Sequence, residues 1–197
     1  MDLLNKIAII TGGSGGIGKA MARAFLKEGA RGVVLADLNK EGLDQAAGEL
    51  GCDSMVCNVT DQQQINDLAS FTQEKYGQVD LFCSNAGAGG EGLLKDDSDL
   101  VWQNQWELHV MSHVYAARAV LPDMISRGEG YLLNTASAAG LLAAIGTGPY
   151  TVTKAAAVKL AEFISITHGD EGIKVSVLCP QGAESYTHLT LPTNREV

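Results

Sequence analysis

Proline, aromatic residues and basic residues are all scarce in this 197-residue chain. It has 4 prolines, 6% aromatic residues, and 14 lysines and arginines against 23 aspartates and glutamates. The resulting net charge of −9 excludes a strongly basic surface, so neither nucleic acid nor an anionic membrane is an expected partner. Hydrophobic residues still make up 46% of the chain, which excludes a disordered protein and suffices for one globular domain.

Paired cysteines and a membrane-spanning run are also missing. The four cysteines form no Cys-x-x-Cys motif, and their spacing fits neither a zinc ribbon nor a disulfide framework, so we expect reduced, buried thiols. The longest uncharged stretch, 130–153, is interrupted by Asn134, Thr135 and Pro149. The N-terminus shows neither a basic start nor a cleavage site. These features predict a soluble, cytoplasmic protein.

Glycine is abundant, with 23 residues, and short apolar runs alternate with helical patterns. The expected strands are 6–10, 32–37, 53–59, 79–85, 128–136 and 174–179. The expected helices are 18–30, 39–50, 60–76 with Thr60 and Gln63 as a capping box, 100–127 and 150–168. Continuously apolar strands separated by helices indicate a parallel sheet that is covered on both faces. The expected fold class is therefore α/β, a Rossmann-like doubly wound sheet of about six strands.

The stretch TGGSGGIG, residues 11–18, connects the first strand to the first helix. Gly13-x-Gly15-x-x-Gly18 is the general dinucleotide-binding spacing, and Gly12-x-x-x-Gly16-x-Gly18 is a wider variant. Either spacing lets the backbone approach a pyrophosphate, whose charge the amides at the helix N-terminus would meet. The alternative interpretation is a structural turn without a ligand.

Asp37 ends the second expected strand. A carboxylate at this place can accept hydrogen bonds from the adenosine ribose and would repel a 2′-phosphate. Neither Ser14 nor Leu38 supplies a cation for such a phosphate. We therefore expect NAD(H) rather than NADP(H) as the cofactor.

In PYTVTK, residues 149–154, Lys154 follows Tyr150 by one helical turn. A cation at that distance favours the phenolate form of a tyrosine and so makes the phenol a usable acid and base. Such a pair also occurs by chance in many helices, so it carries little weight alone.

With the glycine loop, Asp37, Asn85-Ala86-Gly87, Ser137 and Tyr150/Lys154 in this order, residues 3–182 resemble the short-chain dehydrogenase/reductase family. The resemblance implies that Tyr150 exchanges a proton with a substrate hydroxyl or carbonyl oxygen. It also implies that Lys154 holds the nicotinamide ribose and that Ser137 orients the substrate oxygen. The cofactor contacts that it implies are Gly12, Ser14, Gly15, Gly16, Ile17, Gly18, Asp37, Leu38, Asn58, Val59, Asn85, Ala86, Gly87, Tyr150, Lys154, Pro180 and Gly182.

His109 departs from the family pattern, which usually has an asparagine that holds a water near the lysine and locally distorts its helix. Three interpretations are open: the histidine substitutes in this relay as a catalytic residue, weakens catalysis, or is simply packed. His109 and His113 have the spacing of a metal pair, but no third ligand is evident, and we expect no metal. We expect His109→Asn to keep or raise dehydrogenase activity, whereas a large loss would show that the imidazole has an essential role of its own.

Residues 183–197 have no apolar periodicity and differ from the family, whose members continue with a substrate loop, a further helix and a seventh strand. We interpret this segment as an artefactual or disordered tail after an incomplete cofactor-binding domain at 1–182. A chain without the seventh strand and the lid is expected to bind cofactor weakly and to show little or no turnover.

The function implied by the resemblance is NAD-dependent oxidation and reduction between a secondary alcohol and a ketone, in a homodimer or homotetramer. Two alternatives stay open: a catalytically silent nucleotide-binding protein, and a dehydratase or epimerase on the same scaffold. The sequence carries no signature of a particular alcohol.

Overall fold

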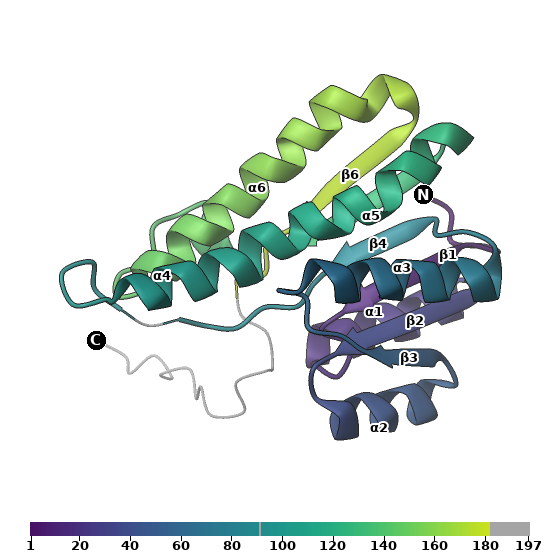
Figure 1. Cartoon of the computed structure of the whole chain (residues 1–197), viewed down its shortest axis with the longest axis horizontal. Coiled ribbons are helices and arrows are strands. Elements are labelled where there is room, and N and C mark those ends of the chain that lie inside the picture. Colours follow the sequence, from purple (N-terminus) through teal and green to yellow (C-terminus); the bar gives the residue numbers. More distant parts are fainter. Residues whose placement is uncertain (91, 182–197) are drawn as a thin grey trace, which may run out of the picture.

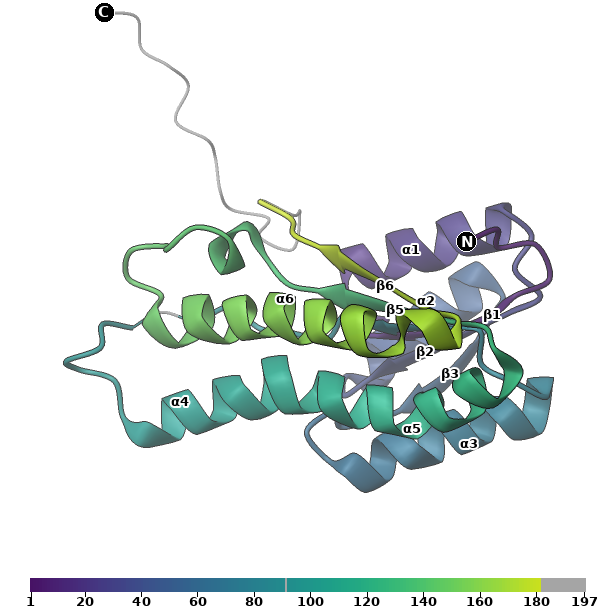
Figure 2. The ribbon, with the colours of Figure 1, turned by 90° about the horizontal axis from the view of Figure 1, so that it is seen from above.

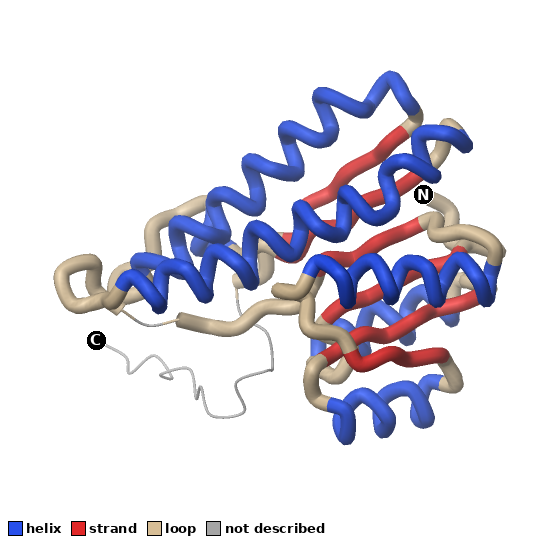
Figure 3. The backbone as a smooth tube through the Cα atoms, in the orientation of Figure 1, coloured by secondary structure: helices blue, strands red, loops and turns tan. Residues whose placement is uncertain are grey.

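Six short apolar segments form one parallel sheet in the computed structural model, which describes residues 1–90 and 92–181. The strands lie in the order β3-β2-β1-β4-β5-β6, as Figures 1 and 3 show. Their bounds are β1 Ile7–Thr11, β2 Gly32–Asp37, β3 Asp53–Val56, β4 Leu81–Ser84, β5 Gly130–Thr135 and β6 Ile173–Leu178. The expected α/β fold with a doubly wound parallel sheet is confirmed.

Helices connect the strands and cover both faces of the sheet. The view in Figure 2 shows α1 and α2 on one face and α3, α5 and α6 on the other. Two short 3₁₀ helices, 138–140 and 169–171, complete the connections. The helix bounds are α1 Gly16–Lys27, α2 Lys40–Leu50, α3 Gln62–Tyr76, α4 Asp99–Trp106, α5 Ser112–Arg127 and α6 Gly148–His168.

Alternate strand residues supply two separate hydrophobic cores, because successive side chains of a strand point to opposite faces. Ile9 and Val34 pack in one cluster with residues of α3 and α5. Ile10 and Leu35, the next residues along each strand, pack in the other cluster with residues of α1 and α2. Burial on both faces explains why β1 and β2 are apolar up to their last residues and do not alternate with polar residues.

The start of α3 differs from the sequence prediction, and the Thr60–Gln63 capping box is wrong. Asp61 caps this helix, since its carboxylate accepts hydrogen bonds from two backbone N–H groups of the first turn at 2.9 and 3.4 Å. Thr60 instead donates its N–H and its hydroxyl to Asn58 Oδ1, at 3.1 and 2.9 Å. The preceding strand also ends at Val56, earlier than expected, so Asn58 lies in a connection.

The predicted helix over 100–127 is not regular. A π-helical turn, Glu107–Met111, separates α4 from α5 and contains His109. A π turn inserts one additional residue into the helix, so the side chains before and after it point in changed directions. The local helix distortion that the family resemblance implied at His109 is therefore present.

The chain order reverses at the centre of the sheet, where β1 lies next to β4. In doubly wound folds this reversal opens a crevice at the carboxyl ends of the strands, and ligands bind there. The connections that follow β1, β2, β3, β4 and β5 all begin at this edge. The predictions for a missing seventh strand and a foreign tail at 183–197 concern residues outside those that the structure describes.

Candidate active site

The glycine loop folds tightly against itself between β1 and α1. Gly12 adopts a φ of +66°, and the amide of Gly15 donates to the carbonyl of Gly12 at 3.2 Å. A Cβ on Gly18 would lie 2.3 Å from that carbonyl oxygen, so only glycine fits at this position. Helix α1 begins at Gly16 without an acidic residue in its first turn. Its N-terminal amides are therefore available to a phosphate group.

A cavity of about 280 Å³ lies over this loop. Nine residues line it, and all nine are among the predicted cofactor contacts: Gly12, Ser14, Gly15, Gly16, Ile17, Gly18, Asp37, Asn85 and Gly87. The tertiary structure thus brings the loop after β1 together with the ends of β2 and β4, as the prediction required.

Asp37 is held firmly at the end of β2. Its Oδ2 accepts hydrogen bonds from the N–H and the hydroxyl of Ser14 at 3.0 and 2.7 Å, and its Oδ1 accepts from the amide of Asn39 at 3.0 Å. The carboxylate lines both the loop cavity and a second, adjacent cavity.

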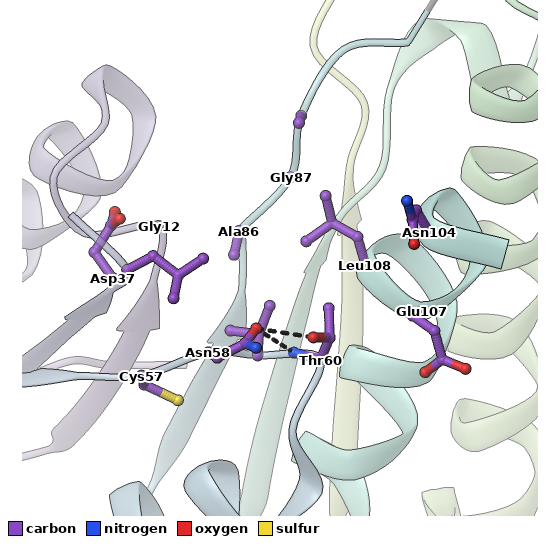
Figure 4. Close-up of a pocket in the computed structure, with 13 residues that line it drawn as sticks. Gly12, Asp37, Cys57, Asn58, Thr60, Ala86, Gly87, Asn104, Glu107 and Leu108 are labelled. Carbon is purple, nitrogen blue, oxygen red and sulfur yellow. Dashed lines mark hydrogen bonds between the residues drawn. The ribbon is translucent and has the colours of Figure 1, made fainter. Parts of the chain in front are cut away.

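This second cavity, of about 590 Å³, continues over the ends of β3 and β4 (Figure 4). Among its described lining residues none is a lysine or arginine, and two are acidic. The predicted contacts in its lining are Gly12, Asp37, Leu38, Asn58, Val59, Ala86 and Gly87. The sequence did not identify Cys57, Thr60, Ala88, Asn104, Glu107 and Leu108, which also line it.

Asn85 has a structural task within the site. Its Nδ2 donates to the carbonyl of Thr11 at 2.9 Å, and its Oδ1 accepts from the hydroxyl of Thr135 at 3.0 Å. These contacts fasten the ends of β1, β4 and β5 to one another. Through these hydrogen bonds to other residues, Asn85 holds together the strand ends that lie beneath the crevice.

Lys154 is buried in α6, with 3% of its surface exposed. Its Nζ donates to the carbonyl of Thr135 at 3.0 Å and lies 5.6 Å from the centroid of the Tyr150 ring. Burial lowers the pKa of the ammonium from 10.5 to about 8. A Cβ on Gly87 would lie 3.2 Å from Nζ, so the loop after β4 passes directly beside this cation.

His109 is fully buried and uses both ring nitrogens. Nε2 lies 3.3 Å from the amide of Ala88, which can only donate, so Nε2 must be the unprotonated nitrogen. Nδ1 then carries the proton and donates to the hydroxyl of Thr153 at 3.1 Å, and that hydroxyl donates to the carbonyl of Pro149 at 2.9 Å. Burial lowers the pKa of the imidazole from 6.5 to about 3, in agreement with this neutral tautomer.

Ser137 and Tyr150 meet at a third cavity, of about 570 Å³. Ser137 follows β5 and accepts a hydrogen bond from the amide of Ala139 at 3.2 Å, which fixes the direction of its hydroxyl oxygen. The Tyr150 ring packs edge-on against the His109 ring, with centroids 5.3 Å apart. Tyr150, Lys154, Ser137 and His109, the four predicted catalytic residues, are thus gathered at the ends of β4 and β5.

The segment after β6 approaches the same region. The carbonyl of Pro180 accepts a hydrogen bond from the amide of Ala138 at 3.0 Å, and Gln181 lines the third cavity. Pro180 therefore lies beside the turn that carries Ser137, whereas Gly182 is outside the described residues. Gln181 was not predicted, because nothing in the sequence distinguishes it from a polar loop residue.

In the described part of the chain, neither metal-binding side chains nor cysteines form a cluster. No group of three or more His, Cys, Asp or Glu side chains converges there in a way that could hold a metal ion. All four cysteines are free; Cys57 and Cys83 are buried, and Cys52 and Cys179 are half-buried. None of the helices in residues 1–90 and 92–181 is long and apolar enough to cross a membrane.

Comparisons with known proteins place this geometry in a family. The family profile described as short chain dehydrogenase matches residues 6–196. An uncharacterized oxidoreductase of Staphylococcus aureus (strain USA300) is 30% identical over 198 residues, covering 98% of this chain and 85% of its own length.

Two solved structures have the same fold. A short-chain dehydrogenase/reductase from Burkholderia phymatum in complex with NAD superposes with a TM-score of 0.87 at 31% identity, and a short-chain dehydrogenase from Streptomyces avermitilis with 0.84 at 32%. The match covers 92% and 90% of this chain, but only 67% and 66% of those chains. The profile match, the similar oxidoreductase and the shared fold together show that this chain belongs to the short-chain dehydrogenase family.

Proposed function

We propose that this protein is an NAD(H)-dependent oxidoreductase that interconverts a secondary alcohol and a ketone. The observation that carries the proposal is the convergence of Ser137 and Tyr150 on one cavity, with the Lys154 ammonium 5.6 Å from the Tyr150 ring. The Lys154 ammonium lies beside Gly87, which also borders the two cavities that we assign to the cofactor.

The residues of the crevice fit a nicotinamide dinucleotide. The glycine loop and the N-terminus of α1 would hold the pyrophosphate, Asp37 the adenosine ribose, and Asn58 and Val59 the adenine. When bound, such a cofactor accepts or supplies the hydride. Because no basic residue lies among the described lining residues, a 2′-phosphate would face Asp37 without a counterion, which favours NAD(H) over NADP(H).

Tyr150 would exchange a proton with the substrate oxygen, and the Ser137 hydroxyl would hold that oxygen in place. Lys154 places a buried ammonium near the Tyr150 ring, and no described carboxylate forms an ion pair with it. With a pKa of about 8, the lysine is still mainly charged at neutral pH.

His109 would act as a positioning residue. Its imidazole links the amide of Ala88 to the hydroxyl of Thr153, and so joins the loop after β4 to the N-terminal part of α6. Tyr150 lies in the preceding turn of the same helix, and Gly87 precedes the bonded amide. A water relay through His109, as its family position suggests, would have to share the imidazole with these two hydrogen bonds.

Cofactor binding is the first test. We expect a fluorescence titration of the purified chain to give an NADH dissociation constant at least about tenfold below that of NADPH, since like charges at the ribose are costly. Asp37→Asn should bring the NADH and NADPH dissociation constants closer together. Asp44→Asn, at an exposed residue, is the control and should leave their ratio unchanged. Equal binding of both cofactors by the unchanged chain would contradict the assignment of Asp37.

Turnover is the second test. In the protein extended by the segments with which its relatives continue, we expect NADH to form from NAD⁺ with a panel of secondary alcohols, and Tyr150→Phe to lower the rate about 100-fold or more while the NADH dissociation constant stays unchanged. NADH binding without turnover of any alcohol would favour the catalytically silent alternative. Consumption of the alcohol without net NADH would favour a dehydratase or epimerase.

We also propose assembly through the face formed by α5 and α6, which lie side by side in Figures 1 and 2. Phe163 and Ile166 on α6 are 62% and 77% exposed, as expected for an apolar interface. Light scattering of the chain, compared with Ile166→Glu, tests this assembly. A monomer at all concentrations would contradict it.

A further inference from the structure

The cavity beside Ser137 and Tyr150 has an unusual lining. Apart from these two residues, its described lining consists of two glycines, four alanines, one leucine, one threonine and one glutamine. No charged side chain is among the described lining residues. The cofactor crevice differs, because Asp37 and Glu107 both line it.

The absence of charge in this lining restricts the substrate. A carboxylate or phosphate group that entered the cavity would lose water without gaining a counterion from the described lining residues, so its binding is disfavoured. The nearby loop adds no cation to the lining either: the Lys95 ammonium lies 3.6 Å from the Asp96 carboxylate and is 79% exposed. Alanine and leucine side chains, in contrast, attract an apolar substrate by excluding water.

Two loops contribute lining residues to this cavity, and we call residues 89–94 and 141–147, without the undescribed residue 91, the cleft rim. The amide of Gly92 donates to the carbonyl of Gly146 at 2.7 Å, and the amide of Gly148 donates to the carbonyl of Gly92 at 3.2 Å. Figure 1 shows the loop before α4 lying beside the start of α6. The two loops are therefore held together by their backbones.

The cleft rim is rich in exposed apolar side chains. Of the 16 exposed large hydrophobic residues in the described chain, five belong to it: Leu93, Leu94, Leu141, Leu142 and Ile145. Ile145 is 99% exposed and Leu142, which also lines the cavity, is 76% exposed. Exposed apolar groups concentrated on the two loops that line this cavity favour an apolar ligand there.

We propose that the substrate is an uncharged, largely apolar secondary alcohol, or its ketone, with a hydrocarbon body. Its oxygen lies at Ser137 and Tyr150, and its body lies against Leu142 and the alanines of the cavity. A cavity of about 570 Å³ has room for such a body. This substrate class rests on the proposed function, because Tyr150 serves as its acid and base.

The test is a calorimetric titration of the chain in saturating NAD⁺ with two ketones, 2-decalone and acetoacetate; NAD⁺ and a ketone are both oxidised, so no turnover interferes. We expect 2-decalone to bind at least about tenfold more tightly than acetoacetate. Leu142→Glu should weaken 2-decalone binding about tenfold and leave the NAD⁺ dissociation constant unchanged. Leu4→Glu is the matched control, since Leu4 is 59% exposed near the N-terminus and should affect neither ligand.

Acetoacetate binding as tight as that of 2-decalone would overturn the proposal, as would an unchanged 2-decalone affinity in Leu142→Glu. If NAD⁺ does not bind, the same ketone titrations are made without it. Turnover of decahydro-2-naphthol, measured on the protein extended by the segments with which its relatives continue, separates the proposed substrate class from the proposed oxidoreductase function. Binding of 2-decalone without any NADH formation would support the substrate class and contradict the oxidoreductase function, whereas turnover of charged alcohols alone would do the reverse.

Discussion

At the scale of single residues, the site combines three buried basic groups. His109, His113 and Lys154 are all at least 97% buried, and the structure places no described carboxylate in an ion pair with any of them. Burial, with the neighbouring lysine charge, lowers the pKa of each imidazole from 6.5 to about 3. Both histidines are therefore neutral in the folded protein at neutral pH. Lys154 is then the one cation among these three groups.

This arrangement predicts acid sensitivity. Between pH 6.5 and about 3 the unfolded chain binds more protons than the folded one, so stability that is fully present above pH 6.5 is lost as the pH falls toward 3. We expect each histidine to lower the free energy of unfolding by about 1.4 kcal/mol per pH unit within this range. Urea denaturation at pH 7, 6 and 5 measures the slope.

His113→Leu should reduce the slope, because it removes one of the two titrating imidazoles. The structure shows no hydrogen-bond partner for either ring nitrogen of His113 among the described residues, so the variant should fold at pH 7 with at least wild-type stability. His168→Gln is the control, because His168 is not one of the two buried imidazoles. It lies beside Glu171 at the end of α6. A slope that is the same in His113→Leu and in the unchanged chain would contradict the prediction.

At the scale of elements, two local distortions build the site. The π-helical turn Glu107–Met111 presents His109 to the loop after β4, and the positive φ of Gly12 turns the chain from β1 toward α1. Both are departures from regular structure at the carboxyl edge of the sheet. Regular strands and helices elsewhere hold these two segments in place.

Gly18→Ala should disrupt the glycine loop, because its Cβ would lie 2.3 Å from the carbonyl oxygen of Gly12. We expect the variant to lose about 1–3 kcal/mol of stability through the forced backbone shift and to bind NADH at least about tenfold more weakly. Gly48→Ala is the matched helical control: its Cβ meets nothing within 4 Å, so stability should rise by about 0.5–1 kcal/mol. Unchanged NADH binding by Gly18→Ala would show that the loop does not hold the cofactor.

At the scale of the whole molecule, the cofactor crevice joins parts that are distant in the chain. The connections after β1, β2, β3 and β4 all contribute lining residues, and the π turn adds Glu107 and Leu108. A ligand that contacts all of these segments stabilises the folded state as a unit, because it binds the unfolded chain much less.

We therefore expect NADH to raise the thermal midpoint. At 100 times its dissociation constant, a ligand adds about 2.7 kcal/mol, which corresponds to about 5–10 °C for a domain of this size. Scanning fluorimetry with NADH, NADPH and no ligand measures the shift, and an equal concentration of NADPH should give a smaller one. No shift with NADH at saturation would contradict binding in the crevice.

Much of the fold could be predicted from the sequence because it depends on local chemistry. Apolar runs such as Ile7–Ile10 and Val33–Ala36 are buried on both faces, which only a covered parallel sheet allows. The predicted order of strands and helices is confirmed. The predicted cap of α3 was wrong because Asp61 and Thr60 are both residue types that cap helices. Only the turn at Asn58, a tertiary feature of the crevice, decides between them.

The sequence alone established the family through residues whose types and spacing carry the chemistry: the glycine loop, Asp37, Ser137 and Tyr150/Lys154. What only the tertiary structure decided are relations between segments far apart in the chain. They include the neutral tautomer of His109, set by Ala88 and Thr153, and the backbone pairing of two loops beside the cavity that Ser137 and Tyr150 line. A sequence specifies which groups are present, but hydrogen bonds, burial and exclusion of charge depend on which groups the fold brings together.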